Sequence, residues 1–272
     1  MMNRQLTLMA VHAHPDDEVL STGGVLALAS DQGIRTVLVT CTNGEQGDGP
    51  GGVKPGEPGH DEAAVRTLRL EELRESVALL GISDVELLGY HDSGMVGWAG
   101  NERPEAFANV PLDQAAGRLA ELMERYRPDV VVTYDENGGY GHPDHIQAHR
   151  ITVAAIERTG IPAKFYHAAL SRSGMADLFE YLRSSGTDLG DFEPPEDFGT
   201  PDEQITTRVD VSPYVVRKRK ALEAHASQGD NIFMLRMPEE GQRRMFGRES
   251  FVRQFSTVPT PEHEDDLFAG LR

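Results

Sequence analysis

Short apolar runs alternate with amphipathic segments between residues 1 and 170. Runs rich in Val, Leu and other apolar residues predict buried strands; they cover residues 6–11, 36–40, 85–88, 130–134 and 164–168. Apolar residues at helical spacing predict helices over residues 20–32, 61–80, 112–126, 143–158 and 175–182. Alternation of strands with helices favours βαβ units. We therefore predict an α/β fold with a Rossmann-like, mostly parallel sheet flanked by helices.

The pattern changes beyond residue 170. Residues 186–203 are rich in acidic side chains and proline, which predicts a solvated surface excursion. Apolar and polar residues alternate over residues 204–211, which predicts a strand, and residues 213–226 are predicted to form a helix. The residues after Pro238 show no clear helical or strand pattern. We predict a Rossmann-like metal-binding core over residues 1–170. A smaller C-terminal α+β portion, residues 171–272, is expected to pack on the core and help to form the substrate cleft.

Residues 43–59 interrupt the alternation with many glycines and prolines and no periodicity. This long loop would leave the sheet at the carboxyl end of a strand. Loops of this length in compact domains are often lids over a site, and the alternative is a disordered insertion.

Two polar turns follow predicted strands, at residues 12–18 and at residues 135–145. The carboxyl ends of parallel strands lie at one edge of a sheet, so the two turns should meet. So many ionisable groups beside an apolar strand cost solvation energy unless they are paired or bind a metal. The spacing predicts a metal site with ligands His14, Asp17 and His145. Hydrolytic zinc and non-haem iron(II) both use two histidines and one carboxylate.

Four residues beside these ligands have side chains suited to acid–base chemistry. Asp16 could accept a proton from the attacking water, or it could instead cap the following helix. His142 could stabilise an oxyanion or protonate a leaving amine. Tyr140 could donate to the same oxyanion, with packing as its alternative role. Asp144 could hold His142 or a ligand histidine in its tautomer.

Composition and charge limit the classes of partner. The net charge of −18 argues against a nucleic acid or an anionic membrane surface as partner. No apolar run approaches the roughly 20 residues that span a bilayer, and the first residues do not resemble a signal peptide. The single cysteine, Cys41, excludes an internal disulfide. A cytoplasmic location is therefore expected.

Residues 13–18 (Ala-His-Pro-Asp-Asp-Glu) and 141–145 (Gly-His-Pro-Asp-His) together resemble the PIG-L or LmbE-like family of zinc-dependent N-acetylglucosaminyl deacetylases. The resemblance extends to other short segments, which are residues 42–45, 92–94 and 220–228 and the pair Arg69 and Glu72. Residues 133–140 and 265–270 are similar to the mycothiol branch of the family. That branch holds the mycothiol deacetylase and the mycothiol S-conjugate amidase.

The resemblance implies specific roles for these residues. It implies Zn²⁺ on the three predicted ligands, Asp16 as general base, and Tyr140 and His142 around the oxyanion. Fe²⁺ remains an alternative because the ligand set suits both metals. The resemblance also implies that Arg69 and Asp92 contact the sugar, although a helical arginine among acids is more often a surface ion pair. Ser21 and Glu45 are further candidate substrate-binding residues.

These observations predict a metal-dependent amide hydrolase that removes an acyl group from a small N-acyl glucosamine-type substrate. Ser21 stands where we expect a lysine in the S-conjugate amidase, so the deacetylase is favoured and the amidase is the alternative. A non-catalytic metal-containing binding protein is a hypothesis from another class. Phosphate-ester hydrolysis is disfavoured, because phosphatases often pair two metals. A homo-oligomer is compatible with the sequence.

Overall fold

Seven strands form one sheet in the computed structural model, which describes residues 4–187 and 198–272. Most of the predicted surface excursion at residues 186–203 lies outside the described residues. The strands, in chain order, are β1 (Thr7–His12), β2 (Arg35–Thr42), β3 (Asp84–Tyr90), β4 (Val130–Thr133), β5 (Lys164–Ala169), β6 (Thr207–Asp210) and β7 (Arg248–Ser256). They lie side by side in the order β3-β2-β1-β4-β5-β7-β6.

The first five strands are parallel, whereas β7 is antiparallel to both β5 and β6. The predicted fold class, a mostly parallel α/β sheet, is confirmed. Strand order reverses at β1, because β2 and β3 extend the sheet on one side of it and β4 and β5 on the other. In open α/β sheets the crevice at such a reversal is where ligands bind.

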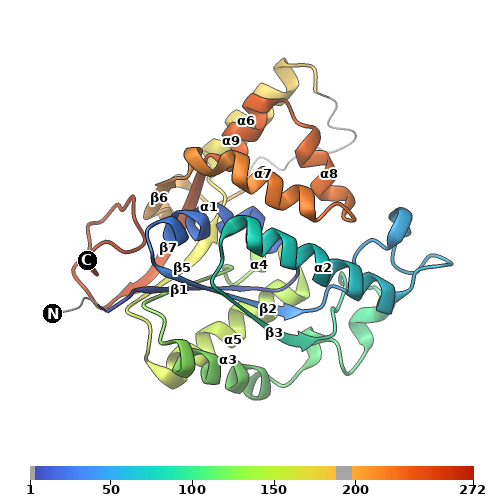
Figure 1. The fold of residues 1–272 in the computed structure, drawn as a ribbon, viewed down its shortest axis with the longest axis horizontal. Helices are drawn as coiled ribbons and strands as arrows, with labels where there is room; N and C mark the ends of the chain where they lie inside the picture. Colours follow the sequence, from blue (N-terminus) through green and yellow to red (C-terminus); the bar gives the residue numbers. More distant parts are fainter. Residues whose placement is uncertain (1–3, 188–197) are drawn as a thin grey trace.

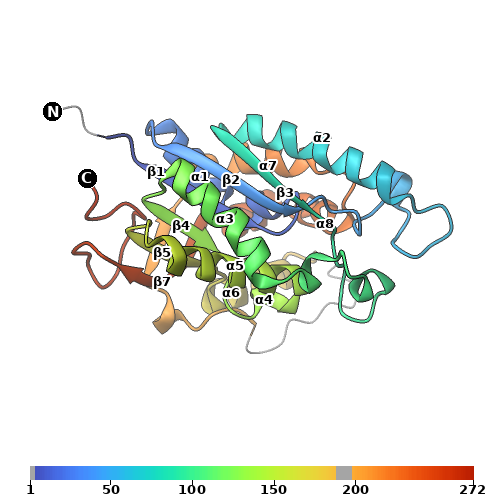
Figure 2. The ribbon, with the colours of Figure 1, turned by 90° about the horizontal axis from the view of Figure 1, so that it is seen from below.

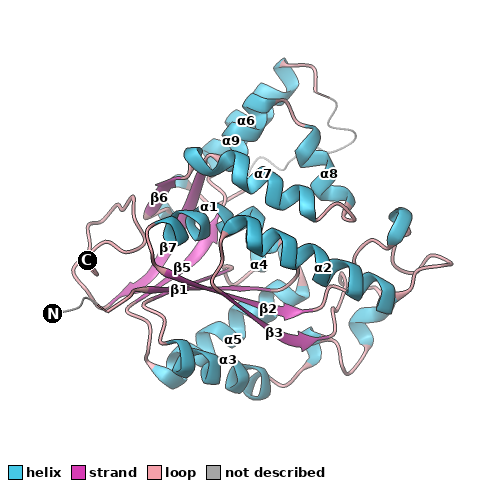
Figure 3. Ribbon diagram, in the orientation of Figure 1, coloured by secondary structure: helices cyan, strands magenta, loops and turns pink. Residues whose placement is uncertain are grey.

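Helices cover both faces of the sheet (Figures 1 and 3). One face carries α3 (Leu112–Tyr126) and α5 (Pro143–Thr159), and the other carries α1 (Asp17–Asp31), α2 (Glu62–Leu80) and α7 (Val215–Ala224). The outer helices beyond α7 are α6 (Arg172–Ser184), α8 (Gly229–Arg236) and α9 (Glu239–Phe246), and a short irregular helix, α4 (Gly138–Gly141), precedes α5.

Successive side chains of β1 point to opposite faces of the sheet and so join two separate hydrophobic cores. Leu8 and Ala10 join the cluster beneath α1, α2 and α7, whereas Met9 and Val11 join the cluster beneath α3 and α5. All four side chains are fully buried. A strand that buries both faces is apolar throughout, which is why residues 6–11 were recognisable as a central strand.

The predicted elements up to residue 182 are present, with boundaries that differ by a few residues. The helix predicted over residues 112–126 matches α3 at both ends. After Pro238, where no helix or strand was predicted, the structure forms α9 and the long strand β7. None of the helices in the part of the chain that the structure describes has the length and apolar character needed to cross a bilayer.

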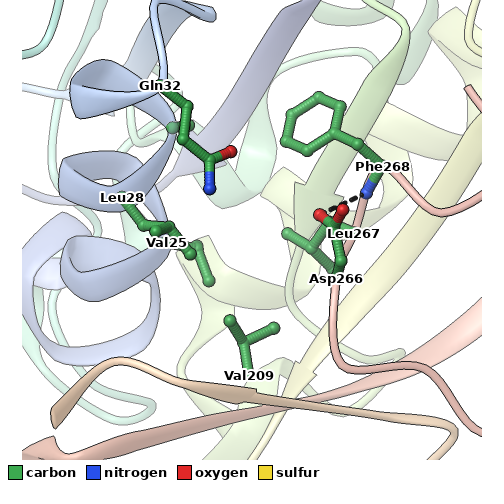
Figure 4. Close-up of a pocket in the computed structure, with 8 residues that line it drawn as sticks. Val25, Leu28, Gln32, Val209, Asp266, Leu267 and Phe268 are labelled. Atoms are coloured by element: carbon green, nitrogen blue, oxygen red, sulfur yellow. Dashed lines mark hydrogen bonds between the residues drawn. The ribbon is translucent and has the colours of Figure 1, made fainter. Parts of the chain in front are cut away.

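The C-terminal residues return to the core and pack on it. Figure 4 shows Leu267 and Phe268 beside Val25 and Leu28 of α1. Both tail side chains are buried, at 2% and 3% exposure. Figure 2 shows the C-terminal residues at the opposite end of the sheet from the loop that follows β2. The division at residue 170 stays a prediction, and the observed β6–β7 pair extends the same sheet.

Gly24 on α1 provides a test of this packing. A Cβ at Gly24 would lie 2.5 Å from Val211 Cγ2 and 2.6 Å from Val211 Cβ. We expect Gly24→Ala to lower the free energy of unfolding by about 1–3 kcal/mol, because overpacking forces the core apart. Urea denaturation measures this change.

Gly117→Ala on α3 is the matched control. A Cβ there would meet only the movable end of the Arg158 side chain, at 3.1 Å. The helix propensity of alanine should therefore raise stability by up to about 1 kcal/mol. Equal effects at the two glycines would contradict the close contact of α1 with Val211.

Candidate metal centre

The two predicted polar turns meet at the carboxyl ends of β1 and β4. β1 ends at His12 and α1 begins at Asp17, so one turn carries His14. β4 ends at Thr133, and α5 begins at Pro143 with His142 as its N-cap residue. Because β1 and β4 are neighbours in the sheet, residues about 130 positions apart come into contact.

The three predicted ligands form a compact triangle. His14 Nδ1 lies 3.3 Å from Asp17 Oδ2 and 3.3 Å from His145 Nε2. Asp17 Oδ1 lies 3.5 Å from His145 Nε2. Donor atoms about 2.0–2.1 Å from a tetrahedral zinc ion are about 3.3 Å apart, so these spacings suit the ion. The side chains are buried, as expected of a site shielded from bulk water.

Outer hydrogen bonds orient both histidines toward the triangle. His145 Nδ1 lies 3.1 Å from the Gly138 carbonyl oxygen, and His14 Nε2 lies 3.2 Å from Asp144 Oδ2. The Gly138 carbonyl and the Asp144 carboxylate are both acceptors. His145 therefore donates through Nδ1 and His14 through Nε2. The inner nitrogens, His145 Nε2 and His14 Nδ1, then present lone pairs to the same point. This arrangement is that of a site prepared for a cation.

Tyr134 supports the carboxylate ligand. Its hydroxyl donates to Asp17 Oδ2 at 2.7 Å and accepts from the Ala13 N–H at 2.8 Å. The Asp17 carboxylate also accepts from the His14 N–H at 2.8 Å. The Tyr134 ring stacks on His145, with centroids 4.1 Å apart. Asp17 Oδ2 thus accepts two hydrogen bonds, and Oδ1 lies 3.5 Å from His145 Nε2.

Asp144 contacts a ligand histidine, His14, which is one of the two roles considered for it. It also accepts from the N–H and the hydroxyl of Ser93, and its side chain is fully buried. His142 Nδ1 accepts the Asp144 N–H at 3.2 Å and so caps α5. Burial, followed by the neighbouring His14 and His145 rings, lowers the pKa of His142 to about 3. His142 is therefore neutral at neutral pH.

Asp16 lies between the ligands in a strained backbone conformation, with φ of 115°. It occupies the N-cap position of α1, but its side chain makes no capping hydrogen bond to that helix. The carboxylate instead lies 3.1 Å from Arg69 Nη2. Burial raises the pKa of the Asp16 carboxyl to about 6, and the Arg69 guanidinium limits that rise. The capping role considered for Asp16 is therefore wrong.

Arg69 is buried beneath the loop after β2, so the interpretation of a surface ion pair is wrong. Its guanidinium donates to the Pro15 carbonyl at 2.6 Å and to the Gly44 carbonyl at 3.0 Å. A Cβ at Gly44 or at Gly47 would lie 2.5 or 2.7 Å from Arg69 Nη1. Glycine at both positions lets this loop close around the arginine. The loop's first residues, 43–45, are buried and residues 55–59 are mostly exposed.

The other candidate substrate-binding residues differ in their surroundings. Asp92 is buried, lies 3.6 Å from His14 Nε2 and accepts the Gly94 N–H. Glu45 accepts from the Asn43 side chain and from the Asp92 N–H, so its carboxylate holds the adjacent turns. Ser21 is half-buried on α1 and joins none of the side-chain hydrogen bonds among the described residues.

Tyr140 lies at the rim. Its side chain is 65% exposed, and its ring stands edge-on to His145 and His142 with centroids 5.1 and 6.1 Å away. Tyr134 and Ser93 support the site but were not among the predicted site residues. Their signal was their position at the carboxyl ends of β4 and β3, beside other polar residues.

Tyr134→Phe tests the support of Asp17. The change keeps the stacked ring but removes the acceptor of the buried Ala13 N–H. We expect the free energy of unfolding to fall by about 1–3 kcal/mol, the usual cost of an unsatisfied buried polar group. Denaturation of the metal-free chain measures this loss.

Tyr126→Phe is the control for removing a tyrosine hydroxyl. Its hydroxyl bonds to the partly exposed Glu86, where water can replace it. The loss should be smaller than for Tyr134→Phe. Equal losses would show that the Tyr134 hydroxyl has no special structural role.

Comparison with known proteins adds three findings. Residues 9–156 match the family model described as PIG-L: GlcNAc-PI de-N-acetylase. The 1D-myo-inositol 2-acetamido-2-deoxy-alpha-D-glucopyranoside deacetylase of Acidothermus cellulolyticus is 44% identical over 97% of this chain and 95% of that protein. Two solved structures have the same fold as this chain.

The N,N'-diacetylchitobiose deacetylase of Pyrococcus horikoshii has a TM-score of 0.55 at 20% identity, covering 91% of this chain and 83% of that chain. GalB, the 4-carboxy-2-hydroxymuconate hydratase of Pseudomonas putida, has a TM-score of 0.61 at 19% identity. That match covers 94% of this chain and 99% of the GalB chain. The two neighbours have different activities, so these likenesses show the fold alone.

Proposed function

The chain belongs to the PIG-L family of GlcNAc-PI de-N-acetylases, and on that premise we propose that it is a metal-dependent deacetylase. We propose an N-acetylglucosamine unit joined to 1D-myo-inositol as its substrate, as in the mycothiol-type deacetylases. The observation that carries the proposal is the ligand triangle with Asp16 beside it. The substrate class is supported by the relative that is 44% identical over 97% of the chain.

We propose Zn²⁺ as the resident cation, held by His14 Nδ1, Asp17 Oδ1 and His145 Nε2. The 3.3 Å between the two histidine nitrogens, the 3.5 Å between His145 Nε2 and Asp17 Oδ1, and the lone pairs directed between them support this assignment. The same ligand set also suits Fe²⁺, which metal replacement distinguishes. A cation held there supplies Lewis acidity, which makes both the attacking water and the amide carbonyl more reactive.

Asp16 is proposed as the general base. Its carboxylate is ordered by Arg69 at 3.1 Å and lies one residue from the ligand Asp17. It would take a proton from the attacking water and return it to the leaving amine, so that acetate and a free amine result. Arg69 bonds to Pro15, Gly44 and Asp16, and we propose that it orients the base.

His142 is proposed to stabilise the oxyanion. Its Nδ1 accepts the Asp144 N–H, so the neutral ring carries its proton on Nε2. That N–H is a donor available to the developing oxyanion. Tyr140, edge-on to the same ring, is proposed as a second donor. Asp144 is proposed to fix the tautomer of His14.

Asp92 is proposed to bind a sugar hydroxyl, because its carboxylate lies 3.6 Å from Nε2 of His14, one of the proposed ligands. Glu45 is proposed to hold Asp92 in place through its N–H. The role of Ser21 stays a prediction, as do the cytoplasmic location, the exclusion of nucleic acid and a homo-oligomer. The S-conjugate amidase also stays a prediction, which the substrate panel below tests.

Removal of the metal tests the ligand assignment. Dialysis against a chelator should abolish deacetylation, and Zn²⁺ should restore it. Zinc at about 1,000 times its dissociation constant should stabilise the folded chain by about 4 kcal/mol, which raises the melting temperature. His145→Ala should remove this zinc-dependent rise. If Fe²⁺ restores more activity than Zn²⁺, iron is the resident metal.

Asp16→Asn tests the general base. We expect kcat to fall about 10²- to 10⁴-fold, because the amide cannot accept the proton, while zinc content stays near that of the parent.

Activity is measured on a panel of substrates that contains N-acetylglucosaminyl-inositol, N-acetylglucosamine and mycothiol S-conjugates. The readout is the amine that each substrate releases. Asp31→Asn, at the exposed end of α1, is the control and should leave kcat unchanged.

Two outcomes would contradict the proposal. If the zinc-loaded parent hydrolyses no amide of the panel, the non-catalytic binding protein becomes the better hypothesis. If Asp16→Asn keeps parental activity, another group is the base. A strong preference for the S-conjugates over the N-acetyl sugar would identify an amidase.

A further inference from the structure

A short segment after α7 joins three distant parts of the chain near the metal centre. His225 Nε2 lies 2.9 Å from Glu18 Oε1 at the start of α1. Ser227 donates to Glu72 of α2 through its N–H and its hydroxyl, at 2.9 and 2.8 Å. The residues that follow Ser227 contact the loop after β2. The C-terminal portion thus reaches the elements that carry Asp16 and Arg69.

Glu18 is the part of this network that reaches Asp16. Its Oε2 accepts the Asp16 N–H at 2.9 Å. Its Oε1 accepts from the Ser76 hydroxyl at 2.6 Å and from His225. Glu18, Ser76 and His225 are all fully buried. One carboxylate therefore connects α2 and the end of α7 to the backbone of the proposed base.

The backbone of Asp16 needs such support. A φ of 115° and ψ of −30° is a conformation that residues with a side chain rarely adopt. Strain of this kind costs about 1–3 kcal/mol and persists only where the surroundings impose it. The Glu18 carboxylate binds the N–H of Asp16, and Arg69 binds the carbonyl of Pro15 in the same peptide unit. Both ends of that peptide are fixed.

His225 supplies the partner that keeps Glu18 in place. A buried carboxylate that loses its cationic or N–H partner is strongly destabilised and turns toward other donors or water. Ser76 alone would leave Glu18 with one neutral side-chain donor. A displaced Glu18 would release the Asp16 N–H, and the strained turn could relax. A shift of about 1 Å in a catalytic group can cost about 100-fold in rate.

We propose that His225 is a positioning residue that holds Asp16 in its catalytic orientation through Glu18. The inference rests on the proposed function for its catalytic consequence. It assigns the end of α7 a role in the chemistry, although His225 lies about 207 positions from Glu18 in the sequence. Gln228, three residues further on, extends the same support to the loop around Arg69, which orients Asp16.

Gln228 provides that extension. Its side chain accepts the Asp48 N–H at 3.2 Å and donates to the Asp48 carbonyl at 3.3 Å. A Cβ at Gly47 would lie 2.6 Å from Gln228 Oε1 and 2.7 Å from Arg69 Nη1. Gln228 and Arg69 therefore enclose the same glycine of the loop. The segment 225–228 supports Asp16 from one side and the loop over Arg69 from the other.

The test compares His225→Leu, His225→Gln and Lys218→Met. Leucine removes the donor to Glu18, whereas the glutamine amide can still donate to it. Lys218 is the matched control, because it lies on α7 and forms a buried ion pair with Glu249, which accepts the Gly24 and Val25 N–H groups of α1. It joins the same two helices without contact to Glu18.

We expect His225→Leu to lower kcat about 10- to 100-fold with KM and zinc content near the parental values. His225→Gln should recover most of the activity. Lys218→Met should lower the melting temperature as much as His225→Leu does, yet keep the parental kcat. In an Asp16→Asn background, His225→Leu should cause no further loss, because it acts through Asp16.

Hydrogen–deuterium exchange of the zinc-free chain gives a readout that needs no substrate. Amides of residues 13–19 should exchange faster in His225→Leu than in the parent and in Lys218→Met. Unchanged exchange there, or losses of kcat that follow the melting temperature equally in both variants, would overturn the inference. If the parent is inactive on the whole panel, the proposed function fails and the exchange rates alone decide whether His225 holds this turn.

Discussion

The parallel pairing of β1 with β4 is the constraint on which the site depends. Register pairs Leu8 with Val130 and Ala10 with Val132, so both strands end at the same edge of the sheet. Two polar turns from distant parts of the chain then meet, and each contributes one of the histidines proposed as ligands. Neither turn holds the full ligand set by itself. The reversal of strand order at this point keeps the crevice between the turns clear of a crossing connection.

Concentrating carboxylates and imidazoles at this edge costs solvation energy, and the surroundings offset it with fixed donors and acceptors. Asp17 receives bonds from a tyrosine hydroxyl and a backbone N–H, and Asp144 receives two from Ser93. The Gly138 carbonyl and the Asp144 carboxylate set which nitrogen of His145 and of His14 carries the proton. Orientation of the donor atoms is thus established by the fold, which reduces what a cation must reorganise on binding.

The C-terminal portion is structurally continuous with the core. β7 extends the sheet beside β5, and the tail packs on α1. Of two buried ion pairs, one joins Lys218 of α7 to Glu249 of β7, and the other joins His225, just after α7, to Glu18 of α1. Buried ion pairs add little net stability, because desolvation opposes their attraction, but breaking one is costly. The two buried ion pairs therefore favour the packing of α7 in which each charged group meets its partner. In the pair between His225 and Glu18, that specificity reaches the backbone of Asp16.

The sequence by itself determined the features that depend on local patterns. Hydrophobic periodicity located the strands and helices up to residue 182, and the motifs at residues 13–18 and 141–145 located a buried cluster of histidines and carboxylates. Local pattern was insufficient for β7, because a strand at the antiparallel end of a mixed sheet mixes polar with apolar residues and resembles no simple period. Tertiary structure alone decided that Arg69 is buried against Asp16, that Asp144 bonds to His14, and that His225 meets Glu18. Each of these contacts joins residues more than 50 positions apart, and the choice of partner follows from how the packed elements aim their side chains.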